Sequence, residues 1–266
     1  MLETLFSPLF AMPFFTGLVL APLLALLGAW LRLREEWLAA MAYAQIAAAG
    51  GVLAAVFHWA LIPGALLVAG LAAVAKGLWQ RAGNDHFALF IILGWGATLL
   101  LAANSAQGEM VGRALLDGQL YFTTTATLIT AVMVALVSLT LLYWMAPRLL
   151  QARFYPDHFR ANNIPAWPHQ IGFDLLAVAV IALGTMALGV MAAFALVFIP
   201  AWIAFHLACG WRQVIGWSMG LSLLAYVPAF VLAIALDQPF APVLTMLLVL
   251  LTPLRLLPIG GTGRMG

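Results

Sequence analysis

The chain has 266 residues, of which 65% are hydrophobic and only 8% are charged, and its mean hydropathy is +1.08. A water-soluble domain of this length does not carry so apolar a composition, so these values exclude a soluble enzyme or binding protein and indicate that lipid surrounds most of the chain. Cys209 is the only cysteine, which excludes an internal disulfide and a metal cage built from several cysteines.

Nine apolar runs are long enough, or nearly so, for the roughly 20 residues that a helix needs to cross a bilayer. They lie near residues 9–31, 37–57, 59–79, 87–105, 120–146, 168–187, 189–208, 213–236 and 239–258. The polar stretches between the runs are short, and the chain contains no low-complexity segment or linker. We therefore expect an all-α polytopic membrane bundle of about eight or nine transmembrane helices, forming a single domain over residues 1–266.

The basic residues fall almost entirely on one side when these runs are threaded through a bilayer in order. With the N-terminus outside, Arg113 is the only Lys or Arg residue in an external segment. The positive-inside rule therefore predicts an external N-terminus and a cytoplasmic C-terminus. The net charge of +2 reflects this insertion pattern and does not indicate a nucleic-acid partner. The basic residues placed in the cytoplasm are Arg32, Arg34, Lys76, Arg81, Arg148, Arg153, Arg160, Arg212, Arg255 and Arg264.

Two loops carry signals of their own. The external loop at 103–119 has an apolar set compatible with a short interfacial helix, and an ordinary connecting loop is the alternative. The cytoplasmic loop at 148–170 contains Pro156 and Asp157, which suit a helix N-terminus, and Asn163, which suits a left-handed helix end. A short helix at about 154–164 is therefore expected outside the membrane.

Several blocks of this sequence resemble the ATP-binding-cassette permeases that import zinc, manganese or iron. The segment FYPDHFRANNI at 154–164 resembles the family's F-D-P-E-L-A-R-A-x-G-V, and GAWLRLR at 28–34 resembles G-x-F-L-V-L-R. GVMAAFALVFIPA at 189–201 resembles G-V-L-L-V-S-A-L-L-V-x-P-A, DQPFAP at 237–242 resembles D-x-P-x-G-P, and DGQL at 117–120 is similar to G-D-I-L. The blocks cover most of the chain in the family's order.

This resemblance implies a permease homodimer in a bacterial inner membrane, driven by cytoplasmic ATPase subunits and supplied by an extracytoplasmic solute-binding protein. The sequence has no Gly-rich phosphate loop, so ATP and Mg²⁺ are expected to be used by the partner ATPase, and no cofactor is expected on this chain. The resemblance also implies that the short cytoplasmic helix docks on the ATPase. The residues assigned to this coupling role are Arg153, Pro156, Asp157, Arg160 and Asn163.

The sequence departs from the family where the family's second span begins with G-D-x-x-x-H, which closes a metal-binding gate. Without a gap, the Asp position is Met41 and the His position is Gln45. A thioether and an amide do not hold Zn²⁺ or Mn²⁺ as a carboxylate and an imidazole do. Two readings remain open: both residues line the solute pathway, or Met41 packs against a neighbour while Gln45 hydrogen-bonds across helices.

Other polar residues give further candidates. Asp85 and His86 are the remaining metal pair, although their position suits a structural role. Asp174 lies about a turn into the sixth apolar run, where a carboxylate is costly unless paired, and His169 or Arg160 is its expected partner. A polar vestibule near the outer surface is predicted from Asn104, Thr123, Thr124 and Asp237.

Together these patterns predict a permease subunit of an ATP-driven importer, which moves a transition metal ion or metal complex by alternating access between two protomers. A non-metal small solute is an alternative, as is a membrane subunit that acts only as a scaffold. A multi-pass membrane enzyme is a further alternative, but it would need paired carboxylates, a His-Asp pair or a Ser-Lys dyad at a defined depth. The sequence shows no such constellation.

Overall fold

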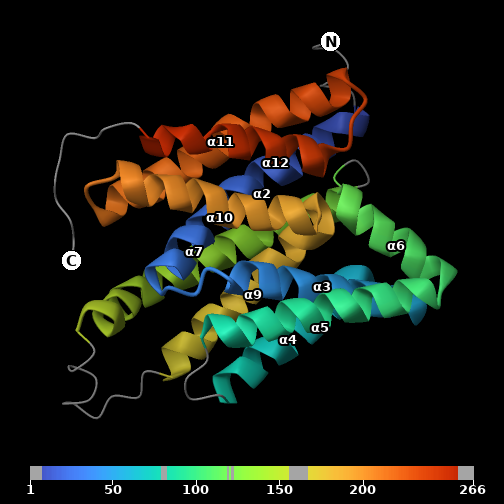
Figure 1. Cartoon of the computed structure of the whole chain (residues 1–266), viewed down its shortest axis with the longest axis horizontal. Helices are drawn as coiled ribbons and strands as arrows, with labels where there is room; N and C mark the ends of the chain where they lie inside the picture. The colour runs from blue at the N-terminus through green and yellow to red at the C-terminus, as the bar shows by residue number, and fades with distance from the viewer. Residues whose placement is uncertain (1–7, 79–82, 119, 121–122, 156–166, 257–266) are drawn as a thin grey trace.

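The computed structural model describes residues 8–78, 83–118, 120, 123–155 and 167–256, and every regular element among them is helical (Figure 1). The all-α prediction is therefore confirmed. The elements are α2 (Pro8–Leu33), α3 (Ala39–Val56), α4 (Leu61–Leu78), α5 (Asn84–Ala103), α6 (Ala106–Asp117), α7 (Thr125–Phe154), α9 (Trp167–Leu188), α10 (Val190–Leu207), α11 (Trp211–Ala235), α12 (Phe240–Leu250) and the 3-10 helix η2 (Thr252–Leu256).

Within the described residues, the nine predicted apolar runs correspond to nine apolar helices. Seven of them are long and apolar enough to cross a membrane, namely α2, α3, α5, α7, α9, α10 and α11, while α4 and α12 are shorter apolar helices. The α-helix α12 ends at Leu250, and the chain continues as η2, which contains Pro253. Proline lacks the amide hydrogen that a continuing α-helix needs, so the last run is divided there.

The loop at 103–119, which the sequence predicts to be external, contains a helix, α6. Ser105 caps its first turn, because its hydroxyl accepts a hydrogen bond from the Gly108 amide at 3.2 Å. The helix lies at one end of the bundle (Figure 1) and contacts α5, α3 and α12. Its C-terminal end meets the turn between α9 and α10, where Gly189 has a φ of 95° and a Cβ would lie 2.9 Å from the Leu115 carbonyl oxygen. Only glycine fits this turn without strain.

The described Lys and Arg residues other than Arg113 lie at the opposite end of the bundle, which we call the basic end. The loops between α2 and α3, α4 and α5, and α10 and α11 all lie there, because successive helices run in opposite directions. Contacts between these segments confirm the shared end, since Asn84 reaches the Glu35 carbonyl oxygen and Lys76 reaches Glu36. Arg113 lies in α6, at the other end.

Helices α3 and α9 are the two most enclosed of the candidate spans, and α3 has α4, α5, α6, α9 and α10 as neighbours. Its sequence is rich in Ala and Gly, which allows other backbones to come close. A Cβ on Gly94 of α5 would lie 2.6 Å from the carbonyl carbon of Gln45, so α5 and α3 touch through their backbones at this point. By contrast, α5 and α7 expose many large apolar side chains, as expected of helices that face lipid or another apolar protein surface.

The contact between α3 and α5 gives a test of this packing. Replacing Gly94 with Ala should destabilise the bundle by about 1–3 kcal/mol, the usual cost of overpacking. Gly96→Ala is the matched control, since nothing lies within 4 Å of its added Cβ and Ala favours the helix. Thermal unfolding in detergent should therefore show a lower midpoint for Gly94→Ala only. Equal midpoints for the two variants would mean that α3 and α5 are not in backbone contact.

Candidate functional site

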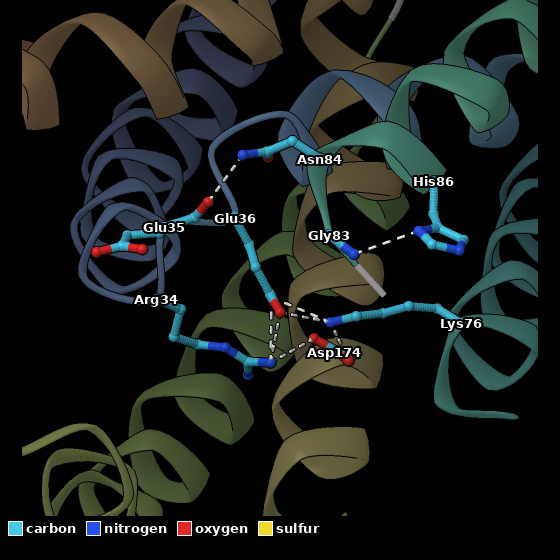
Figure 2. A network of polar contacts seen from close by, with 8 residues as sticks. All are labelled: Arg34, Glu35, Glu36, Lys76, Gly83, Asn84, His86 and Asp174. Atoms are coloured by element: carbon cyan, nitrogen blue, oxygen red, sulfur yellow. Dashed lines mark hydrogen bonds and ion pairs between the residues drawn. The ribbon is translucent and has the colours of Figure 1, made fainter. Parts of the chain in front are cut away.

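Four charged side chains converge at the basic end of the bundle, where the loop between α2 and α3 meets α4 and α9 (Figure 2). Arg34 and Glu36 come from the loop, Lys76 from the last turn of α4, and Asp174 from the second turn of α9. We call these four residues the charge cluster. Lys76 and Asp174 are almost completely buried, with 6% and 2% of their surface exposed. The cluster contains two cations and two carboxylates, so its formal charge is zero.

Lys76 is the centre of the charge cluster. Its ammonium group lies 2.8 Å from Asp174 Oδ2 and 3.0 Å from both carboxylate oxygens of Glu36. Arg34 Nη2 lies 3.1 Å from Glu36 Oε2 and 3.4 Å from Asp174 Oδ1, and the latter contact lacks hydrogen-bond geometry. Each carboxylate therefore faces both cations, which offsets the cost of removing these charges from water.

Aromatic rings close the sides of the charge cluster. The Arg34 guanidinium lies 4.7 Å from the Phe173 ring centroid, and the Lys76 ammonium lies 5.3 Å from that of Phe87. Both rings are fully buried. Cations over ring faces gain a favourable electrostatic contact, and the apolar wall lowers the local dielectric, so the ion pairs inside are stronger than surface pairs.

The loop that supplies Arg34 and Glu36 is held on its other side as well. The chain turns at Glu35, which has a φ of 62°, and the Glu35 carboxylate pairs with Arg153 at the end of α7. The Glu35 carbonyl oxygen accepts a hydrogen bond from Asn84 Nδ2 at 3.1 Å (Figure 2). A few residues on, Ala39 begins α3. The loop thus connects the ends of α2, α4, α5, α7 and α9 to the start of α3.

The structure corrects the predicted partners of Asp174. His169 does not pair with Asp174, because its Nε2 lies 2.7 Å from Arg148 Nη1, and Lys76 and Arg34 take its place. Arg160 lies outside the described residues. From the sequence, Lys76 is expected only as one of the cytoplasmic basic residues. Lys76 lies near the end of one apolar run and Asp174 lies near the start of another. Two opposite charges inside apolar runs need partners, and this was the signal from which their pairing could have been predicted.

The predicted gate positions both lie in α3. Gln45 is 8% exposed, whereas Met41 is partly exposed and packs at the margin of the apolar core. The two residues are four positions apart in the sequence, which is about one helical turn, so they share a face of the helix. Of the predicted coupling residues, Arg153 ends α7 and pairs with Glu35. Pro156, Asp157, Arg160 and Asn163 lie outside the described residues.

The predicted vestibule residues make local contacts. Asn104 Nδ2 donates to the Leu100 carbonyl oxygen at 2.7 Å, and Thr123 Oγ1 donates to the Leu120 carbonyl oxygen at 2.9 Å. Thr124 caps α7 by accepting a hydrogen bond from the Thr127 amide at 3.4 Å. Asp237 lies in the turn between α11 and α12, with a φ of 51°. These contacts serve helix ends, and a shared vestibule stays a prediction.

The proposed metal pair lies at the start of α5. His86 Nδ1 accepts a hydrogen bond from the Gly83 amide at 3.3 Å, so the imidazole binds the backbone at the start of this helix (Figure 2). Within the described part of the chain, no group of three or more His, Cys, Asp or Glu side chains gathers as a metal site would require. A metal role for Asp85 and His86 stays a prediction.

The charge cluster should dominate the stability of the basic end. Lys76→Met leaves two carboxylates facing one cation, and breaking a buried pair in this way should cost about 3–5 kcal/mol. Adding Asp174→Asn leaves only the ion pair of Arg34 and Glu36, whose charges cancel. The double variant should therefore be more stable than Lys76→Met. Arg113→Gln removes an exposed pair with Glu109 and should change stability by less than about 1 kcal/mol. Denaturant unfolding in detergent measures all three, and a double variant less stable than Lys76→Met would contradict the cluster.

Comparisons with known proteins agree with this architecture. The chain can be superimposed on PsaBC from Streptococcus pneumoniae in complex with Fab with a TM-score of 0.84, at 14% sequence identity, over 97% of this chain and 95% of the other. It is also similar to an inward-facing structure of a protein assigned to the metal-chelate type of ABC transporter, with a TM-score of 0.75, 14% identity, and coverage of 93% and 85%. At this identity the likeness shows a shared fold.

No curated protein sequence matches the chain. The sequence pattern of the ABC 3 transport family, however, matches residues 8–257, which is nearly the whole chain. The family resemblance identified from the separate sequence blocks is therefore confirmed, and the polytopic helical bundle is the fold of an ABC permease. The chain belongs to the ABC 3 transport family.

Proposed function

We propose that this chain is the permease subunit of an ABC importer that carries a transition metal ion or a metal complex across a bacterial inner membrane. The observation that carries the proposal is the family match over residues 8–257, together with nine apolar helices in the fold of an ABC permease. In this proposal two copies of the chain form the translocation unit. Cytoplasmic ATPase subunits use ATP and Mg²⁺ to drive it, and an extracytoplasmic binding protein delivers the solute.

The proposed orientation places the basic end in the cytoplasm. The described cations other than Arg113 gather at that end, as the positive-inside rule requires of cytoplasmic segments. The N-terminus and α6 are then external. The segment at about 154–164 is then cytoplasmic and is the proposed docking element for the ATPase, although its residues from 156 onward lie outside the described part of the chain.

The proposed pathway passes α3 at Met41 and Gln45. Neither side chain is the carboxylate or imidazole that binds Zn²⁺ or Mn²⁺ tightly, so a bare divalent ion would meet no strong ligands there. This favours a gate that only restricts the passage of an ion, or a metal that crosses as a complex. One structural neighbour is assigned to the metal-chelate type, which supports the second alternative. Because these ligands are missing, a small solute that contains no metal is the second candidate for the transported substance.

The loop between α2 and α3 provides a physical route from the ATPase to this gate. Arg153 lies just before the proposed docking segment and pairs with Glu35, while Glu36 joins the charge cluster. Ala39 starts α3 only a few residues later, and Met41 lies in its first turn. A displacement of the docking segment would therefore reach the start of α3 through the Arg153 and Glu35 pair and the loop.

Transport by the assembled complex tests the proposed function. The permease, its ATPase and its binding protein are reconstituted in proteoliposomes, and uptake of Zn²⁺, Mn²⁺, Fe²⁺, Cu⁺ and their chelated forms is measured with and without ATP. We expect ATP-dependent uptake of a metal species, and Gln45→Leu should reduce it, because a bulky apolar side chain obstructs the gate. ATP-dependent uptake of a non-metal solute alone would support the second candidate, and failure of any ATPase to associate would contradict both.

The Arg153 and Glu35 pair gives a separate test of the route. Arg153→Glu places two carboxylates together and should lower transport per ATP hydrolysed. Its thermal stability should change little, because exposed ion pairs are worth at most about 1 kcal/mol. Swapping the charges, with Glu35→Arg added, should restore transport. Arg113→Glu at the opposite end is the control and should not change the ratio. No recovery in the swapped variant would mean that Arg153 acts directly on the ATPase.

A further inference from the structure

Tyr43 carries a buried polar group that the packing of α3 does not explain. It lies between the proposed gate positions Met41 and Gln45, and its side chain is fully buried. Among the described residues, its hydroxyl has no hydrogen-bond partner. A second fully buried tyrosine, Tyr226, donates its hydroxyl to the Phe14 carbonyl oxygen at 2.9 Å. Buried hydroxyls without partners destabilise a fold and are rare, so the Tyr43 hydroxyl needs a partner.

Two more unpartnered atoms belong to the charge cluster. Arg34 Nη1 and Asp174 Oδ1 are both buried, and neither has a hydrogen-bond partner within the described part of the chain. They are neighbours, because Arg34 Nη2 lies 3.4 Å from Asp174 Oδ1 (Figure 2). One is a hydrogen-bond donor and the other is an acceptor. The charge cluster is therefore electrically neutral, but its hydrogen bonds are incomplete.

The Tyr43 side chain reaches the same region. Its ring packs edge-on against Phe87, with centroids 5.8 Å apart and ring planes at 82°. The Lys76 ammonium lies 5.3 Å from the centroid of that same ring. Tyr43 is also close enough to Asp174 and Arg34 for their charges to act on its hydroxyl. An unpartnered donor, an unpartnered acceptor and an unpartnered hydroxyl thus lie around one small region between α3, α9 and the loop after α2.

The charges around this region restrict what can bind there. Arg34 and Lys76 repel a metal cation, while Asp174 and Glu36 repel an anion. A neutral molecule remains, and it must both donate and accept hydrogen bonds. Water does so, and buried waters commonly make about three hydrogen bonds to polar groups that lack other partners. It can enter from the loop side, where the side chains of Arg34 and Glu36 keep 14% and 16% of their surface exposed.

We propose that one water molecule is bound between Arg34, Asp174 and Tyr43. Its oxygen accepts hydrogen bonds from Arg34 Nη1 and from the Tyr43 hydroxyl, and it donates one hydrogen to Asp174 Oδ1. The bonds to the guanidinium and to the carboxylate involve charged groups, and such bonds are shorter and stronger than neutral ones. The water joins α3 to α9 and to the loop after α2. A side chain two residues from each gate position is thereby held by the charge cluster.

A density map of the full-length protein in lipid nanodiscs, at a resolution that shows ordered water, tests the site directly. We expect a peak within hydrogen-bond distance of Arg34 Nη1, Asp174 Oδ1 and the Tyr43 hydroxyl. A map without that peak would overturn the proposal. A hydrogen bond made directly from Tyr43 to Asp174, with no water between them, would overturn it as well.

Thermal unfolding in detergent gives a second measurement, with matched tyrosine variants. Tyr43→Phe keeps the ring and removes the hydroxyl, and it should lower the midpoint by about 2–4 °C, as the loss of one hydrogen bond does in a protein of this size. Tyr226→Phe removes a hydroxyl that has a protein partner and should lower the midpoint by a similar amount. A midpoint for Tyr43→Phe at or above that of the wild type would mean that its hydroxyl binds no water.

The water site also makes Tyr43 a positioning residue for the gate, a consequence that rests on the proposed function. In the reconstituted complex, measured well below the unfolding midpoints, Tyr43→Phe should lower transport per ATP hydrolysed. Tyr226→Phe should keep that ratio, since its hydroxyl bonds to α2 and not to the charge cluster. An unchanged ratio in Tyr43→Phe would contradict the positioning role. Absence of transport by the wild type would contradict the proposed function and would leave the result of the density map unaffected.

Discussion

The ion pair between Lys76 and Asp174 is the contact on which the rest of this bundle depends. Both groups are almost completely buried inside the protein, where an unpaired charge is expensive because water does not solvate it. At 2.8 Å the two charges can only remain if α4 and α9 stay side by side. Glu36 and Arg34 then complete the neutral set, which fixes the loop between α2 and α3 against both helices.

The central position of α3 follows from this arrangement and from its small side chains. The charge cluster holds the loop that leads into α3, while the Ala and Gly residues of α3 let α4 and α5 approach its backbone. A helix packed on so many sides cannot move alone. Any change at its first turn must be accompanied by a change in the loop, and in the proposed importer the pair between Glu35 and Arg153 is therefore the point of mechanical input to Met41 and Gln45.

The outer surface follows a different rule, because lipid replaces protein as the neighbour. Most exposed apolar side chains of α5 and α7 need no specific partner there. The face of α10 and η2 differs, since the Arg255 guanidinium lies 4.0 Å from the Trp202 ring centroid and its buried Nε has no hydrogen-bond partner among the described residues.

The sequence by itself determined the helical class, the number of apolar runs, the separation of basic residues from Arg113, and the family, because these depend on local hydrophobicity and on short ordered blocks. It also identified Asp174 as a carboxylate in need of a partner. Only the tertiary structure decided that the partner is Lys76 rather than His169, since 98 residues separate Asp174 from Lys76 along the chain and no local pattern links them. Likewise, only the packing of α10 against α12 and η2 brings Arg255 over Trp202, because long-range contacts depend on how whole helices fit together.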